Sequence, residues 1–220
     1  MGLSHVLNTL KSLGFEPDRI LDLGARTGDW TRECMKVYPH AHYNLIDAIH
    51  FDDLHWFDNH DNVDYSISLV SDVEKEVDWY ELKNSGDSMF KEVTAHFKDV
   101  KPVKRMTTTL SSLFPDKRTR FDLIKIDCQG SEIPILEGGK DIMSKADIIV
   151  LEMPFMGKYN ENVPSFIEHV TYMDHNGFIP FNIVENHQAH GILFQIDMAF
   201  VSKTHPINER AQLRINSLGA

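Results

Sequence analysis

The chain has 220 residues, of which 42% are hydrophobic and 25% charged, so it is long enough to fold as one domain with a sizeable core. Its formal net charge of −11 disfavours a nucleic-acid partner, because affinity for a phosphate backbone depends on Lys and Arg side chains. The two cysteines, Cys34 and Cys128, are too few for a disulfide framework or a cysteine-based zinc site.

The sequence carries no targeting or membrane signal. The N-terminus lacks the basic flank and the long apolar run of a signal peptide. No apolar run reaches the ~18 residues that a membrane-spanning helix needs. We therefore expect a cytoplasmic protein without a membrane partner.

Helix and strand patterns alternate through the first third of the chain. Apolar residues recur at helical spacing before Gly14, which predicts an N-terminal helix within residues 1–14. The segments that follow are a strand at 20–23, a helix at 29–37, a strand at 43–46, a helix at 49–57 and a strand at 64–70.

Residues 74–109 interrupt this alternation. Val77 and Trp79 indicate a short strand, and the β-branched residues of 103–109 indicate its partner. We expect an inserted β-hairpin. The sequence does not decide whether this hairpin lies beside the sheet or covers a substrate as a lid.

The alternation resumes in the second half of the chain. Its predicted elements are strands at 121–127, 148–151, 178–184 and 195–202, and helices at 133–137 and 165–173. Only a loop at 187–191 joins the last two strands, so they should be antiparallel. The pattern predicts one α/β domain over residues 1–220, with a doubly wound seven-stranded sheet, a terminal antiparallel strand pair and a C-terminal tail at 203–220.

A glycine-containing loop follows the first strand. Gly24 and Gly28 would let the backbone approach a ligand closely, although an ordinary strand-to-turn junction has the same pattern. A dinucleotide-binding loop would have glycines where this chain has Arg26 and Asp29. The loop, with Asp22 before it, is instead similar to the first motif of Rossmann-like methyltransferases.

Acidic residues occur at or near the ends of five successive strands, namely Asp22, Asp47, Asp72, Asp127 and Glu152. The carboxyl ends of parallel strands meet at one edge of the sheet, so these acids predict a shared polar site. Asp47 is placed to hold ribose hydroxyls, or else it caps the following helix. Asp72 with Ser71 could hold an adenine amino group, or else forms a turn.

Four segments resemble the FkbM-type methyltransferase family. They are LDLGARTG at 21–28, TLSSL at 109–113, IKIDCQGSEIPILEG at 124–138 and QIDMAFV at 195–201. The resemblance covers about residues 15–202 and implies S-adenosylmethionine as the cofactor, with methyl transfer to a hydroxyl of a sugar or natural product. Two positions depart from the family pattern: Arg26 replaces an Asn, and Asp47-Ala48 replaces Glu-Pro.

The expected cofactor-binding residues are Asp22, Gly24, Ala25, Arg26, Gly28, Asp47, Ser71, Asp72 and Asp127. The candidate general bases are Asp127, Glu152 and His187, because each is predicted beside the site. Arg26 could pair with the cofactor carboxylate or with Asp29, and Lys125, inside a strand, should pair with a nearby acid. No resident metal is expected, since the histidines lack metal-binding spacing, although Asp127 and Glu152 could hold a divalent ion.

Two other classes of function stay open. A nicotinamide-dependent oxidoreductase could use a similar sheet, but Arg26, Asp29 and the antiparallel ending disfavour it. A binding module could keep the cofactor fold without catalysis. In every case the expected partner is a small molecule, such as a sugar or another hydroxylated metabolite, and a homodimer is compatible with the sequence.

Overall fold

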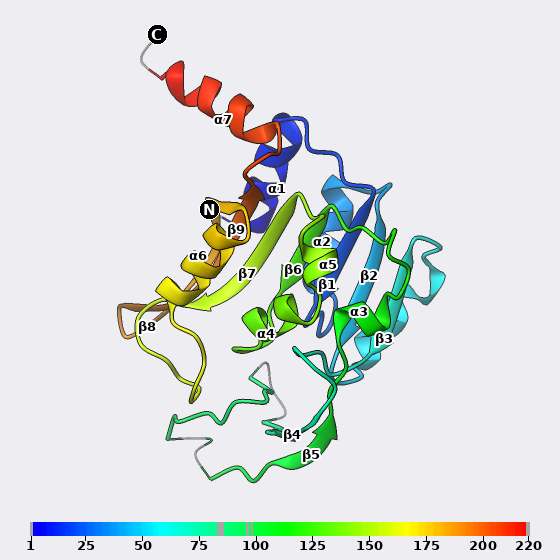
Figure 1. Ribbon diagram of the computed structural model, residues 1–220, viewed down its shortest axis with the longest axis vertical. Coiled ribbons are helices and arrows are strands. Elements are labelled where there is room, and N and C mark those ends of the chain that lie inside the picture. The colour runs from blue at the N-terminus through cyan, green and yellow to red at the C-terminus, as the bar shows by residue number, and fades with distance from the viewer. Residues whose placement is uncertain (1, 83–85, 96, 98, 219–220) are drawn as a thin grey trace.

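The computed structural model describes residues 2–82, 86–95, 97 and 99–218 (Figure 1). The predicted N-terminal helix, insertion and C-terminal tail are therefore described except for residues 1, 83–85, 96, 98 and 219–220. Within the described ranges, no helix combines the length and the apolar character that crossing a bilayer requires.

One seven-stranded sheet forms the centre of the molecule, in the order β3-β2-β1-β6-β7-β9-β8. Its strands are β1 (Arg19–Leu23), β2 (His42–Asp47), β3 (Val63–Ile67), β6 (Leu123–Ile126), β7 (Ile148–Pro154), β8 (Phe178–Ala189) and β9 (Ile192–Ser202). The first five in this list run parallel, and β9 runs antiparallel to both β7 and β8. The predicted doubly wound sheet with a terminal antiparallel pair is confirmed.

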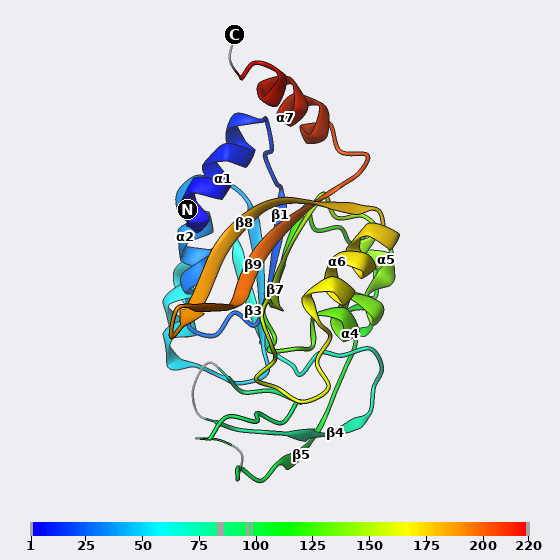
Figure 2. The ribbon, with the colours of Figure 1, turned by 90° about the vertical axis from the view of Figure 1, so that its left-hand side faces the viewer.

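Helices cover both faces of the sheet (Figure 2). On one face lie α1 (Leu3–Ser12), α2 (Asp29–Val37) and the 3-10 helix η1 (Asp52–Asn59); on the other lie α3 (Leu110–Leu113), α4 (Glu132–Glu137), α5 (Lys140–Met143) and α6 (Phe166–His175). Side chains alternate between the faces along β1, so Ile20 joins one core while Leu21 and Leu23 join the other. By the same alternation, the side chain of Asp22 lies on the same face as Ile20 and points toward α2.

The insertion forms its own two-stranded sheet. Strands β4 (Glu76–Trp79) and β5 (Val103–Met106) pair antiparallel and are not part of the main sheet. The pair lies at the end of the molecule opposite to α7 (Ile207–Asn216), as Figure 1 shows. The predicted hairpin insertion is therefore present.

The last strand pair is longer than the sequence predicts. The expected loop at 187–191 is wrong, because β8 continues to Ala189 and β9 starts at Ile192. The chain reverses at His190 and Gly191, whose φ angles are 52° and 77°. Two successive left-handed residues make the tight turn that matches the twist of paired strands. His187 consequently lies in a strand.

Three further expectations need correction. The predicted tail contains the helix α7. In the described part of the chain Ile207 is its only buried residue, so the segment lacks the repeated apolar positions that would predict a helix. Arg210 Nη1 and Arg214 Nη2 attach this helix to the carbonyls of Leu13 and Ser12, each at 2.6 Å. Residues 52–59 form a 3-10 helix in place of the predicted α-helix, and β3 ends at Ile67, before the predicted 70.

The close approach of the β1 and β6 loops predicts a specific sensitivity at Gly24. Its φ is +75°, and a Cβ there would lie 1.8 Å from the backbone oxygen of Asp127. Gly177 has a similar φ of +86° with no atom within 4 Å of its Cβ position. We expect Gly177→Ala to cost about 1–2 kcal/mol from backbone strain, and Gly24→Ala clearly more, in urea-unfolding measurements. Equal losses would show that the loops do not pack this closely.

Candidate active site

A cavity of about 1180 Å³ opens at the carboxyl ends of the parallel strands. It is large enough for a cofactor together with a small acceptor, since ligand pockets are typically ~300–1,000 Å³. Its lining includes polar or loop residues from several strand ends, among them Gly24, Ala25, Arg26, Asp47, Asp127, Gln129, Glu152, Tyr159, His187 and Asp197. Trp79 and Glu92, from the insertion, also line it. The insertion therefore contributes a wall of the cavity.

The loop after β1 is held by Asp47 at the end of β2. Asp47 Oδ2 accepts a hydrogen bond of 2.7 Å from the backbone N–H of Arg26, and Oδ1 accepts one of 2.9 Å from Ile49. These two donors fix the carboxylate and leave lone pairs for a ligand. The alternative role of Asp47 as a helix cap is wrong, because η1 begins at Asp52 without it.

Arg26 adopts a left-handed conformation, with φ of 48°, in this loop. Its side chain is exposed and lines the cavity. Its guanidinium makes no hydrogen bond or ion pair with any described residue. Asp29 instead accepts hydrogen bonds from Thr27 and Arg32, each at 2.7 Å, so the expected alternative of an Arg26–Asp29 pair is not formed. Arg26 thus places an unpaired cation on the lining of the cavity.

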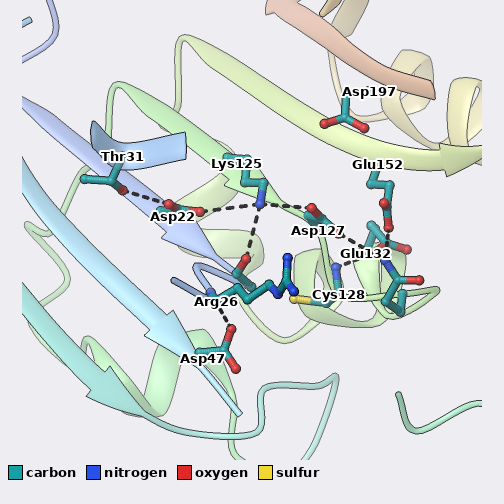
Figure 3. Close-up of polar contacts among 12 residues, drawn as sticks. Asp22, Arg26, Thr31, Asp47, Lys125, Asp127, Cys128, Glu132, Glu152 and Asp197 are labelled. Atoms are coloured by element: carbon teal, nitrogen blue, oxygen red, sulfur yellow. Dashed lines mark hydrogen bonds and ion pairs between the residues drawn. The ribbon is translucent and has the colours of Figure 1, made fainter. Parts of the chain in front are cut away.

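A buried cluster of charges joins β1 to β6 below the loop (Figure 3). Lys125 Nζ lies 3.6 Å from Asp22 Oδ1, 3.1 Å from Asp127 Oδ2 and 3.2 Å from the carbonyl oxygen of Gly24. The predicted pairing of Lys125 with an acid is confirmed. Asp22 Oδ2 also accepts a hydrogen bond of 2.7 Å from Thr31 Oγ1 on α2. Burial alone would lower the pKa of Lys125, but the carboxylates of Asp127 and Asp22 outweigh it and raise that pKa.

Gln129 links two of the candidate bases. Its Nε2 donates to Glu152 Oε2 at 2.7 Å and to Asp127 Oδ1 at 3.3 Å, while its Oε1 accepts a bond of 2.5 Å from the Tyr159 hydroxyl. Buried Glu132 orients the same loop by accepting bonds from the backbone N–H groups of Cys128 and Gly130. Sequence reasoning assigned no role to Gln129 or Tyr159, although Gln129 lies inside the motif at 124–138.

The pKa values of the two carboxyl groups shift in opposite directions. Burial, together with the adjacent Asp127 carboxylate, raises the pKa of Glu152 well above its usual range. Burial would also raise the pKa of Asp127, but the Lys125 ammonium outweighs it and the pKa is lowered. These opposite shifts favour a proton on Glu152 over one on Asp127. Such a pair can exchange a proton with a hydroxyl placed beside it.

His187 is the third candidate base that reaches the cavity. It is half-buried on β8, with Nε2 3.7 Å from Asp197 Oδ1 on β9. The Asp197 carboxylate raises the pKa of His187. Asp127, Glu152 and His187 are thus brought together at one wall of the cavity, as the sequence predicts.

Four expected cofactor-binding residues lie outside the cavity lining. Asp22 is fully buried beneath the loop, and Gly28 starts α2 with its Cα against the ring of Phe57. Asp72 accepts hydrogen bonds from Ser71 Oγ and Lys75 Nζ, at 2.9 and 2.8 Å. Their contacts to a cofactor stay predictions, and for Ser71 and Asp72 the geometry adds no support.

The buried cluster predicts a coupled pair of substitutions. Lys125→Met should reduce the free energy of unfolding by about 3–5 kcal/mol, because it leaves buried carboxylates without a cation. Asp22→Asn in the same chain should restore part of this loss, which chemical denaturation of the two variants and the double variant would measure. If the loss of unfolding free energy in the double variant equals the sum of the losses in the two single variants, Lys125 and Asp22 do not interact directly.

The fold resembles those of solved methyltransferases. A methyltransferase FkbM from Methylobacillus flagellatus KT superposes with a TM-score of 0.57 at 11% identity, over 90% of this chain and 48% of that one. This chain therefore spans about half the length of that protein. Two further structures contain S-adenosylhomocysteine: a 1,6-didemethyltoxoflavin-N1-methyltransferase from Burkholderia thailandensis, and magnesium protoporphyrin IX methyltransferase from Synechocystis PCC 6803.

The first of these two has a TM-score of 0.51 at 13% identity, over 91% of this chain and 76% of that one. The second has a TM-score of 0.52 at 10% identity, over 91% of this chain and 81% of that one. At such identities the likeness shows the fold alone. No curated protein sequence matches the chain. The model of the methyltransferase FkbM domain, however, matches residues 22–180, which is most of the chain. The chain belongs to the FkbM methyltransferase family.

Proposed function

We propose that this protein transfers the methyl group of S-adenosylmethionine to a hydroxyl oxygen of a small molecule. The observation that carries the proposal is the Asp47 carboxylate, which two backbone N–H groups hold at the end of β2, on the wall of the large cavity. A carboxylate at this strand end is suited to accept hydrogen bonds from both ribose hydroxyls. Membership of the methyltransferase family supports the same cofactor.

The proposed cofactor position follows from the loop after β1. Gly24 brings its backbone close to the cavity, with Ala25 beside it. Arg26 offers an unpaired guanidinium near this loop, so it can bind the carboxylate of the methionine moiety. In this arrangement the ribose lies at Asp47, and the sulfonium methyl points toward Asp127 and Glu152.

The reaction needs few chemical groups from the protein. The acceptor oxygen attacks the methyl carbon in line with the carbon–sulfur bond, which breaks to leave S-adenosylhomocysteine as a neutral thioether. The hydroxyl proton passes to the Asp127–Glu152 pair, which Gln129 and Lys125 hold in place. The main contribution of the cavity is alignment of the oxygen and the methyl group.

Several finer expectations stay predictions. Methylation on oxygen, a sugar or hydroxylated-metabolite acceptor, a cytoplasmic location and a homodimer rest on the sequence and on the family resemblance. A neighbouring structure is named for methylation of a nitrogen, so the fold is compatible with other acceptor atoms. An oxidoreductase is disfavoured because Arg26 and Asp29 occupy glycine positions of the dinucleotide motif.

Calorimetry with S-adenosylhomocysteine and with NAD tests the cofactor directly. We expect S-adenosylhomocysteine to bind and NAD to give no heat of binding, and binding of NAD alone would overturn the proposal. Transfer of labelled methyl groups to a panel of sugars and hydroxylated metabolites then separates an enzyme from a binding module. A protein that binds the cofactor but methylates no member of a broad panel would favour the binding module.

Asp47 provides a matched test of the ribose contact. Asp47→Ala should weaken S-adenosylhomocysteine by about 1–3 kcal/mol, because it removes the acceptor of the ribose hydroxyl bonds. Asp72→Ala is the control, since Asp72 is an acid in the segment after β3 but lies outside the cavity lining. Affinity would be measured by calorimetry for both variants. A larger loss for Asp72→Ala than for Asp47→Ala would reverse the assignment.

A further inference from the structure

Three side chains from adjacent strands converge at the acceptor wall of the cavity. They are Glu152 on β7, Asp197 on β9 and His187 on β8. Glu152 is directly opposite Asp197 in the antiparallel ladder, and His187 is opposite Gln195, two residues from Asp197. This register puts all three on one face of the sheet. One ligand atom from each lies within 4.8 Å of the other two.

Asp197 is left without a hydrogen-bond partner in this cluster. Its side chain is only 7% exposed, and its buried Oδ1 makes no hydrogen bond. His187 Nε2 lies 3.7 Å from this oxygen, which is too long for a hydrogen bond. Figure 3 shows Asp197 above Glu152. A buried carboxylate oxygen in this condition costs free energy unless a ligand satisfies it.

The charges around the cluster are not balanced. Glu152 and Asp197 lie directly opposite each other on paired strands, an arrangement that disfavours ionisation of both carboxyl groups at once. Lys125, the buried ammonium close by, is already paired with Asp22 and Asp127. His187 can supply one positive charge, but its imidazole is too far from Asp197 to bond it in the present geometry.

We propose that Glu152, His187 and Asp197 bind a first-row divalent metal ion. Two carboxylate oxygens and one imidazole nitrogen are a ligand set for Mn²⁺, Fe²⁺ or Zn²⁺. Ligand bonds of about 2.1 Å put atoms on opposite sides of an ion ~4.2 Å apart. The observed spread of 4.8 Å needs only a small inward movement, which the half-exposed His187 side chain can supply. This donor set is not evident from histidine spacing, because the ligands come from three strands.

A metal here would extend the proposed reaction. The ion would face the cavity beside Asp127, so its remaining coordination positions could hold oxygens of the acceptor and lower the pKa of a bound hydroxyl. That role rests on the proposed methyl transfer, whereas binding of the metal does not. The binding can therefore be tested without cofactor or acceptor.

The test is metal titration of the 220-residue protein after treatment with a chelator. Mn²⁺ would be followed by the loss of the free-ion signal in electron paramagnetic resonance, and Zn²⁺ by calorimetry. We expect one ion per chain. Asp197→Asn should weaken the affinity for the ion at least about tenfold, since even substitution of residues that hydrogen-bond to metal ligands lowers metal affinity about 10–100-fold. Asp64→Asn is the matched control, because Asp64 pairs with His42 Nε2 at 2.8 Å at the opposite edge of the sheet, and among the described residues this pair belongs to no cluster of three possible metal ligands.

The outcomes separate this proposal from the previous one. Stoichiometric binding that Asp197→Asn weakens and Asp64→Asn preserves supports the site, whether or not S-adenosylhomocysteine binds. If Asp197→Asn does not fold, His187→Ala takes its place, because His187 is half-exposed and its loss leaves the core unchanged. Failure of folded wild-type protein to bind either ion, or equal affinity in the ligand variant and the control, would overturn the site.

Discussion

The ammonium of Lys125 is the interaction on which the site depends. From β6 it contacts a carboxylate of β1, the carbonyl of the first loop at Gly24 and Asp127, so it fixes two adjacent strand ends to each other. Buried ion pairs contribute little net stability, because desolvation offsets their attraction. Its main effect is therefore on position. It holds the loop after β1, where we propose that the cofactor binds, and Asp127, which we propose faces the acceptor, in one geometry.

The cavity has two sides that meet at Asp127. The loops after β1 and β2 supply Arg26 and Asp47, which are suited to the charged and hydroxylated parts of the proposed cofactor. The ends of β7, β8 and β9 supply acids and a histidine to the opposite wall. The proposed proton transfer and the proposed metal site both belong to that second side, where a hydroxyl of the acceptor would lie.

The position of the strand-end acids Asp47, Asp127 and Glu152 at the cavity could be predicted, because a parallel sheet brings the carboxyl ends of its strands to one edge. Asp22 was expected to contact the ligand, but it points at Thr31 because side chains alternate along β1. Asp72 lies away from the cavity because β3 ends at Ile67. Gln129, Tyr159 and the Glu152–His187–Asp197 cluster depend on contacts between distant segments. The spacing of residues along one sequence contains no information about such contacts. The helix α7 could not be predicted for another reason, because it buries little apolar surface.

The most direct test of the account is a crystal structure of the protein with S-adenosylhomocysteine. We predict that both ribose hydroxyls lie within hydrogen-bond distance of Asp47, that the methionine carboxylate contacts Arg26, and that the sulfur faces Asp127 and Glu152. A ligand bound outside the cavity at the carboxyl ends of the strands, or a ribose without contact to Asp47, would contradict it.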